Sequence, residues 1–306
     1  MMDEDSSDHQ IRAAAFEFLD RLTLQHGEVL PSTELRGGFS FDGQRVPLMG
    51  PQGIFKPAVL EWPLSITTVP VVPGKARPYE DELGNDGFLR YRYRGTEPGH
   101  KDNRGLREAM QRKLPLVYFY GVERGQYLAE WPVFIVGDEP QQLTFTVQVD
   151  DPFASGQDVA DQLPDDARRA YATRLAKQRL HQLAFRHRVL RAYRDCCAMC
   201  RLHHRDLLDA AHILPDTHPE GEPATSNGLA LCKLHHAAFD RNIVGVRPDS
   251  VIEIRRDVLE EIDGPMLRHG LQDLQGQALL VVPRGLRDRP NTKFLDERYQ
   301  IFRAAS

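Results

Sequence analysis

The sequence predicts an α+β chain of two domains, with a mainly β domain in front and a metal-stapled module behind it. Three observations support this division. Short apolar runs between turn residues fill the chain from about residue 30 to 150. A polar stretch rich in Asp comes next and is typical of a linker. All 4 cysteines then lie within residues 196–232 among histidines, which favours a metal site over a disulfide framework.

The sequence also predicts where the protein is located in the cell and where its domains begin and end. The acidic, polar start differs from a signal peptide, and no apolar run is long enough to span a membrane, so we expect a cytoplasmic protein without a membrane partner. We expect residues 1–10 to be a disordered N-terminus, 11–152 the front domain, 153–164 a linker, and 165–306 the second domain with a basic helical lead-in.

The front domain is predicted to be a β-barrel preceded by a helix. Apolar residues have helical spacing over 11–25. The runs "LSITTVPVVP", "FLRYRYRG", "PLVYFYGV", "PVFIVG" and "LTFTVQV" then alternate or are rich in β-branched and aromatic residues, as strands are. The segment "DNRGLREAMQRK" interrupts the strands with one predicted helix.

The lead-in to the second domain carries a local positive charge. Residues 1–160 have 16 Lys/Arg and 24 Asp/Glu, a net charge of −8, whereas residues 161–306 have 23 and 20, a net charge of +3. Within 165–194 there are nine basic and two acidic side chains. This pattern fits either a solvated helix face or a helix that contacts a polyanion.

Two short ligand pairs predict a structural zinc site. Cys197 and Cys200 form one pair, and Cys232 and His235 form the other, about thirty residues later. This is the spacing of a closed Cys3His zinc site, which ties two distant turns together in a module with little core. Cys196 could replace Cys197 as a ligand, but its spacing is poorer.

The sequence around these ligands resembles the HNH (ββα-metal) nuclease motif over roughly residues 180–300. The segments "AAHILP", "NGLALC" and "HHAAFD" place His212, Asn227 and His236 at the three signature positions. The resemblance implies that His212 activates water, that His236 binds a catalytic divalent cation, and that Asn227 orients the general base. A histidine with a near-neutral pKa suits water activation in phosphodiester hydrolysis.

A catalytic cation site is expected on the helix that carries His236. Asp240 lies four residues later on the same helix face, so both side chains can reach one Mg²⁺ or Mn²⁺ ion. The motif commonly has a further ligand immediately before the general base, but this chain has Ala211 there. Either Asp209 substitutes for that ligand, or the cation keeps fewer protein ligands and more water.

The front domain resembles the SRA domain, a β-barrel that flips a modified cytosine out of duplex DNA, over roughly residues 30–150. The resemblance rests on "YEDE" at residues 79–82, "YRG" beginning at Tyr93, and "NRGL" in the following helix. It implies that Tyr79 and Tyr93 sandwich the base and that Glu82 or its neighbour Asp81 accepts the amino protons of cytosine.

Further DNA contacts are expected from two segments. The loop "FSFDGQRVPLMGPQGIFKP" resembles the groove-entering segment of that domain, and it offers Arg45, Gln52 and Lys56. The basic lead-in helix offers Arg186 and Arg188 for the phosphate backbone.

Together these resemblances suggest a modification-dependent restriction endonuclease of the SRA–HNH kind. Its partner would be double-stranded DNA with 5-methylcytosine or 5-hydroxymethylcytosine, and one nuclease site per chain favours a homodimer for cutting both strands. Two alternatives remain: an HNH endonuclease whose front domain does not read modified bases, and a non-enzymatic, zinc-stapled reader of modified DNA.

Overall fold

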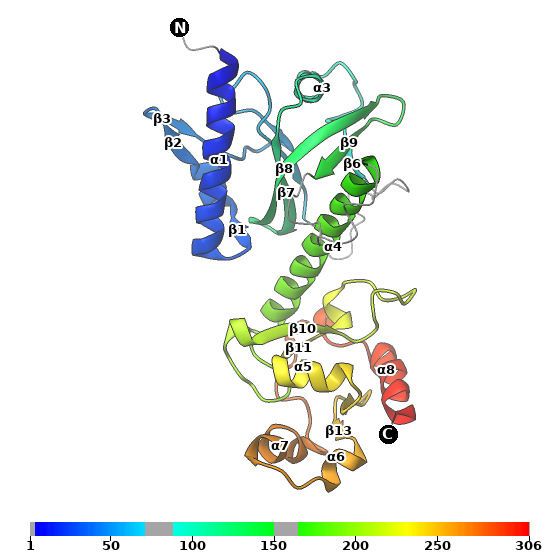
Figure 1. The fold of residues 1–306 in the computed structure, drawn as a ribbon. Coiled ribbons are helices and arrows are strands. Elements are labelled where there is room, and N and C mark those ends of the chain that lie inside the picture. The colour runs from blue at the N-terminus through cyan, green and yellow to red at the C-terminus, as the bar shows by residue number, and fades with distance from the viewer. Residues whose placement is uncertain (1–3, 71–87, 150–164, 306) are drawn as a thin grey trace. The chain divides into compact units, whose positions relative to one another are not determined.

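The computed structural model describes residues 4–70, 88–149 and 165–305. They divide into two compact units, Met1–Leu180 and His181–Ser306. Figure 1 shows that the first unit contains the large sheet and that the second contains a small β-hairpin surrounded by helices. Mixed α+β structure is therefore confirmed.

The first unit combines short strands with three complete helices among its described residues. Its helices are α1 (Glu4–His26), α2 (Ser32–Gly37) and α3 (Lys101–Gln111). Its strands are β1 (Val29–Pro31), β2 (Phe39–Phe41), β3 (Gln44–Val46), β4 (Ile54–Phe55), β5 (Ser65–Thr68), β6 (Leu89–Arg92), β7 (Leu116–Glu123), β8 (Gln126–Glu139) and β9 (Thr144–Val149). The predicted helix within residues 102–113 is confirmed as α3.

The large sheet curls into a half-barrel. Its strands run in the order β4-β5-β7-β8-β9-β6, and β1 also pairs with β8. The β5–β7 pair is parallel, and the other pairs are antiparallel. The long strand β8 changes register against β9 between Ile135 and Gly137, where a bulge increases the bend of the sheet. Within the described residues β4 and β6 do not pair, so the predicted barrel is observed as an open half.

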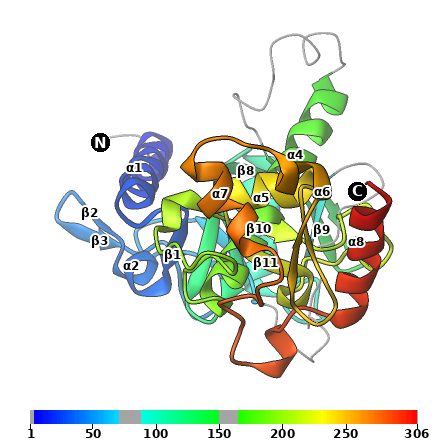
Figure 2. The ribbon, with the colours of Figure 1, turned by 90° about the horizontal axis from the view of Figure 1, so that it is seen from below.

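Helix α1 corrects the prediction of a disordered N-terminus. It begins at Glu4 and lies beside the β2–β3 hairpin (Figure 2). The buried guanidinium of Arg12 forms an ion pair with Asp8 and donates hydrogen bonds to the carbonyls of Pro63 and Pro115, each at 2.9 Å. This contact explains why the helix continues before Ile11, a cause that the polar composition of the N-terminus did not reveal.

Helix α4 (Asp165–Ala192) places the unit boundary later than predicted. We expected the second domain to begin at residue 165, but the first unit extends to Leu180. The hydroxyl of Thr173 accepts a hydrogen bond from the amide of Val149 at 3.0 Å. Arg179 donates to both carboxylate oxygens of Glu130 at 2.7 Å. The first half of the helix therefore packs on the sheet. The predicted linker at 153–164 lies outside the described residues.

The second unit contains the predicted strand, loop, strand and short helix in that order. Its strands are β10 (Leu208–His212), β11 (Gly228–Cys232), β12 (Val244–Val246) and β13 (Ile252–Ile254). Its α-helices after α4 are α5 (Lys233–Asp240), α6 (Arg256–Glu260), α7 (Pro265–Gly270) and α8 (Thr292–Ala304). Short 3₁₀ turns cover Arg205–Leu207, Thr225–Asn227, Gln272–Leu274 and Leu286–Asp288.

The β10–β11 hairpin lies at the core of this unit. Leu208 is opposite Cys232, and His212 is opposite Gly228. A Cβ atom on Gly228 would lie 2.5 Å from Val189 Cγ2, so only glycine allows α4 to pack so close to the hairpin. Tyr193, directly after α4, is fully buried and donates to the carbonyl of Gly228 at 3.2 Å.

None of the helices in the described ranges is long and apolar enough to cross a membrane.

We predict that Arg12→Met destabilises the first unit because the buried pair with Asp8 and two carbonyl contacts are lost. The free energy of unfolding should fall by about 3 kcal/mol, since breaking a buried ion pair leaves an unpaired group. Urea denaturation measures this change. The matched control is Arg21→Met on the exposed side of the same helix, which should be close to neutral. Equal effects of the two substitutions would contradict the anchoring role of Arg12.

Candidate functional site

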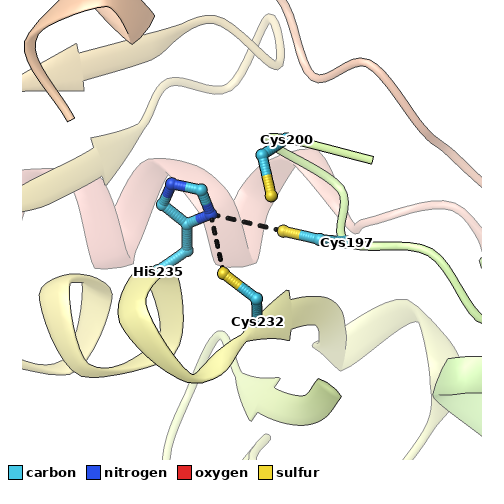
Figure 3. A group of neighbouring side chains, drawn as sticks. All are labelled: Cys197, Cys200, Cys232 and His235. Carbon is cyan, nitrogen blue, oxygen red and sulfur yellow. Dashed lines mark hydrogen bonds between the residues drawn. The ribbon is translucent and has the colours of Figure 1, made fainter. Parts of the chain in front are cut away.

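The four predicted zinc ligands come together in the second unit. The sulfur atoms of Cys197, Cys200 and Cys232 and a ring nitrogen of His235 all lie within 4.8 Å of one another. Figure 3 shows the four side chains pointing toward one another from a turn, the end of β11 and the first turn of α5. Cys196 is not part of this group, because its sulfur lies 3.4 Å from His203 Nδ1.

The geometry of this cluster fits zinc. His235 Nδ1 lies 3.4 Å from Cys197 Sγ and 3.2 Å from Cys232 Sγ. Tetrahedral zinc with ordinary bond lengths separates nitrogen and sulfur ligands by about 3.6 Å. The other ring nitrogen, Nε2, donates to the carbonyl of Gly270 at 2.8 Å, which leaves Nδ1 free as the ligand. The cluster is therefore a candidate closed structural site.

Backbone hydrogen bonds fix the turn that carries Cys197 and Cys200. The amide of Ala198 donates to the carbonyl of Ala230 on β11 at 2.7 Å, and Arg201 adopts a positive φ of 62° to close the turn. The amide of Arg201 then donates to the carbonyl of Cys197 at 3.0 Å. The turn thus holds Cys197 and Cys200 against the strand that ends at Cys232.

A second group of polar side chains lies where β10 ends and along α5. His236 Nε2 lies 3.3 Å from Asp240 Oδ2. Adjacent ligands of one Mg²⁺ ion are separated by about 3 Å, so these two side chains are suitably placed for one divalent cation. Helix α5 packs against β10, the strand that ends at His212, and Asp209 on β10 lies 3.6 Å from His236. His212, His236 and Asp240 therefore come from two adjoining elements.

His212 has the environment expected of a general base. Its ring stacks on Phe185 with a centroid separation of 3.9 Å, and only 22% of the side chain is exposed. Burial lowers its pKa below the ordinary histidine value of 6.5, and the carboxylate of Asp216 offsets part of that effect. His212 Nε2 lies 2.9 Å from Asp216 Oδ1 but makes no directed hydrogen bond within the described residues. The neutral, basic form of the ring is therefore favoured.

Asn227 fixes the loop between the two strands. Its fully buried side chain accepts from the amide of Leu214 at 2.9 Å and donates to the carbonyls of Leu214 and Glu222 at 3.0 and 3.1 Å. Its backbone carbonyl accepts from the amide of Ile213 at 2.9 Å. These bonds hold the backbone directly after His212.

Asp209 lies near two cationic side chains and the ring of His236. Its Oδ2 lies 2.8 Å from Lys233 Nζ and 3.6 Å from His236 Nδ1, and its Oδ1 lies 3.5 Å from Arg186 Nε. Burial raises the pKa of Asp209, but the contacts with His236 and Lys233 outweigh that effect and hold the pKa of Asp209 well below its usual range. The same carboxylate raises the pKa of His236 despite burial. Asp209 is thus behind His236, on the Nδ1 side.

The front unit has a cavity of about 180 Å³ beside the β6 strand. Its described lining comes from the segments 53–54, 67–69 and 91–95. Tyr93 lines this cavity but is only 3% exposed. Its hydroxyl donates to Asp138 and accepts from Arg107 at 2.9 Å, and its ring lies 4.5 Å from that of Phe145. The other predicted pocket residues, Tyr79, Asp81 and Glu82, lie outside the described residues.

Most of the predicted DNA-contacting side chains are engaged within the protein. Arg45 donates to the carbonyls of residues 36 and 37, and Lys56 donates to the carbonyl of Leu60 at 2.8 Å. Arg186 and Arg188 likewise donate to backbone carbonyls of the second unit. Gln52 is exposed on a loop.

Sequence reasoning missed four residues at this site. Asp216 and Phe185 contact His212, Lys233 contacts Asp209, and Arg298 contacts the end of α5. Only Lys233 had a usable signal, since it begins the helix that carries His236. Asp216 lies on the loop after β10, and Phe185 and Arg298 lie on the distant helices α4 and α8. No helix or strand periodicity predicts these three contacts.

Comparisons with known proteins agree with the arrangement of the second unit. Residues 197–247 match the family described as HNH endonuclease. No curated protein matches the chain in sequence. Among solved structures, a "Modification dependent TagI restriction endonuclease" aligns over 78% of this chain and 80% of its own, with 15% identity and a TM-score of 0.32. That superposition is too loose to carry a structural argument. The HNH match makes the chain a DNA endonuclease by class.

We predict that Cys197→Ser releases zinc and unfolds the second unit, because the buried thiolate is replaced by a poor zinc ligand. Metal content and thermal denaturation of the full chain measure the change. Cys196→Ser is the matched control, since its sulfur lies outside the cluster, and it should retain zinc and wild-type melting. If only the Cys196 variant lost zinc, Cys196 and not Cys197 would be the zinc ligand.

Proposed function

We propose that this protein is a modification-dependent restriction endonuclease that recognises 5-methylcytosine or 5-hydroxymethylcytosine in double-stranded DNA and hydrolyses phosphodiester bonds with Mg²⁺ or Mn²⁺. The observation that carries the nuclease part is the placement of His212 on β10 and of the neighbouring His236 and Asp240 on α5, two elements that pack together within the HNH-matching segment. A catalytic base beside a pair of divalent-cation ligands is the minimum that metal-assisted phosphodiester hydrolysis requires.

In the proposed mechanism His212 takes the proton from the attacking water. Stacking on Phe185 fixes the plane of its ring, and the bonds of Asn227 fix the backbone that follows it. Asp216 lies 2.9 Å from Nε2 and can stabilise the imidazolium that forms. When bound between His236 and Asp240, a divalent cation would supply Lewis-acid stabilisation of the scissile phosphate and the leaving oxygen.

Asp209 acts through His236 in this proposal. Its Oδ2 faces Nδ1 of His236, while Asp240 faces Nε2. A carboxylate on the outer nitrogen of a metal-binding histidine sets the tautomer and orients the ring. Of the two expectations for the missing ligand at Ala211, this arrangement favours a cation with fewer protein ligands and more water.

The front domain supplies the proposed recognition of the modified base by base flipping. Tyr91 and Tyr93 are among the residues that line the cavity beside β6. An extruded base needs an aromatic or apolar slot of limited size, and about 180 Å³ lies below the usual range for drug-sized ligands. Tyr79 and the carboxylates of Asp81 and Glu82, which lie outside the described residues, remain part of this proposal as base-reading side chains.

One observation favours the alternative of an HNH endonuclease whose front domain does not read modified bases. Tyr93 is nearly buried, and its hydroxyl and ring are already engaged with Asp138, Arg107 and Phe145. A tyrosine in this position can line the cavity and pack in the core without contacting a base. Cutting both strands further requires two nuclease sites, so we propose a homodimer for either function.

A cleavage panel separates the two functions. Matched duplexes with cytosine, 5-methylcytosine, 5-hydroxymethylcytosine or glucosylated 5-hydroxymethylcytosine are incubated with the full chain and Mg²⁺. We expect cleavage of the methylated and hydroxymethylated duplexes only, since a closed slot excludes the sugar. Equal cleavage of the unmodified duplex would establish the alternative.

The pH dependence of cleavage tests the role of His212. Because the ring must be neutral to accept a proton, the rate should rise with pH through the pKa of His212 and be lost below it. Since burial lowers that pKa, the midpoint of the acidic limb should fall below 6.5 at saturating metal. Asp216→Asn removes a group that raises the pKa and should shift the midpoint further down.

His212→Ala completes this test. We expect it to reduce the rate by about 10²–10⁴-fold, the usual contribution of a general base. An acidic limb that stays unchanged in Asp216→Asn, or wild-type cleavage by His212→Ala, would remove His212 from the mechanism.

A further inference from the structure

Helix α5 places a metal ligand at a structurally weak point. It has eight residues, and Asp240 is the last of them. Isolated helices of this length are unstable in water, and their ends fray first. The C-terminal end of a helix also carries a partial negative charge, which disfavours a carboxylate there. Some other part of the protein must therefore keep Asp240 in place.

Arg298 on α8 contacts residues on both sides of Asp240. One guanidinium nitrogen, Nη2, donates to the carbonyl of Phe239 at 2.5 Å, and Nη1 donates to the side-chain oxygen of Asn242. The guanidinium carbon also lies 4.6 Å from the centre of the buried Phe239 ring. Asn242 adopts a positive φ of 53°, which ends the helix. These contacts fix the last turn of α5 from outside.

The charge of Arg298 also suits its position. Burial lowers its pKa, and the nearby carboxylate of Asp240 opposes that effect. A cation at the C-terminal end of a helix compensates the partial charge of the carbonyls and the charge of Asp240. The contact is therefore electrostatic as well as directional, as a planar guanidinium fork allows.

Helix α8 is itself firmly attached to the site. The backbone amide of Asn291, at its N-terminal end, donates to the carbonyl of Ser226 at 2.9 Å, next to Asn227. Phe302 packs so close to β12 that a Cβ on Gly245 would lie 2.5 Å from its ring. Figure 1 shows α5 and α8 within the second unit. Helix α8 lies beyond the segment that matches the HNH family.

We propose that Arg298 is a positioning residue that holds Asp240 on the same face of α5 as His236, so that both reach one divalent cation. This inference rests on the proposed function, in which these two side chains are the cation ligands. Arg298 itself does not touch the reacting atoms.

The test measures Mn²⁺ binding to the zinc-loaded full chain in the absence of DNA, with free Mn²⁺ followed by electron paramagnetic resonance. Arg298→Met should raise the Kd for Mn²⁺ by about 10-fold, since outer partners of metal ligands typically contribute that much. Arg298→Lys keeps the charge but not the fork, and should give a smaller rise. Arg303→Met, on the exposed side of α8, is the matched control and should bind as wild type.

Cleavage kinetics give a second readout that a general loss of stability would not produce. In Arg298→Met the half-saturating Mn²⁺ concentration should rise by the same factor, while the rate at saturating Mn²⁺ stays near wild type. Should that variant fold poorly, Asn242→Gly carries the test, because glycine tolerates the positive φ and removes only the Nη1 acceptor. It should raise the Kd for Mn²⁺ by less than Arg298→Met.

Two outcomes are decisive and distinguishable. Wild-type Mn²⁺ binding by both Arg298→Met and Asn242→Gly overturns the positioning role. Asp240→Ala tests the premise separately: if this variant binds Mn²⁺ as well as wild type, the ligand assignment in the proposed function fails, whatever the Arg298 variants do.

Discussion

Helix α5 is the element on which both candidate metal sites of the second unit depend, because each takes side chains from its eight residues. His235 faces the three cysteines, and His236 faces Asp240. Consecutive residues on a helix point about 100° apart, so neighbouring histidines can serve separate sites. So short a helix has little stability of its own. The cysteine cluster must fix its first turn, and Arg298 its last, before the second site can form.

The cysteine cluster and the proposed catalytic residues lie in one unit because they share the same strand and helix. The turn at Cys197 bonds to β11, and β11 leads directly through Cys232 into α5. Closing the cluster therefore sets both the strand and the helix that follows it. His212 lies on the partner strand, opposite Gly228, so the register of one hairpin places the base relative to the cation ligands. A structural metal in this cluster would thus supply stability that a larger hydrophobic core supplies in bigger domains.

Sequence reasoning succeeded where function depends on local spacing. The two ligand pairs and the four-residue step from His236 to Asp240 are short-range patterns, and the structure brings their members together. It failed where contacts span the chain. Phe185 stacks on a histidine 27 positions later, and Arg298 reaches back 59 positions to Phe239, so no periodicity reveals either. The early start of α1 has the same origin, since Arg12 bonds to Pro115 across 103 positions.

The missing ligand before His212 has a structural cause. Ala211 is fully buried within the core of the second unit and lies opposite Leu229 on β11. An aspartate or histidine there would have to displace packed side chains and bury a polar group without a partner, which costs several kcal/mol, or roughly 2–7 by transfer scales. Asp209 is half-exposed at the start of the strand and is engaged by Lys233. A carboxylate is therefore stable at that position, from which it faces Nδ1 of His236.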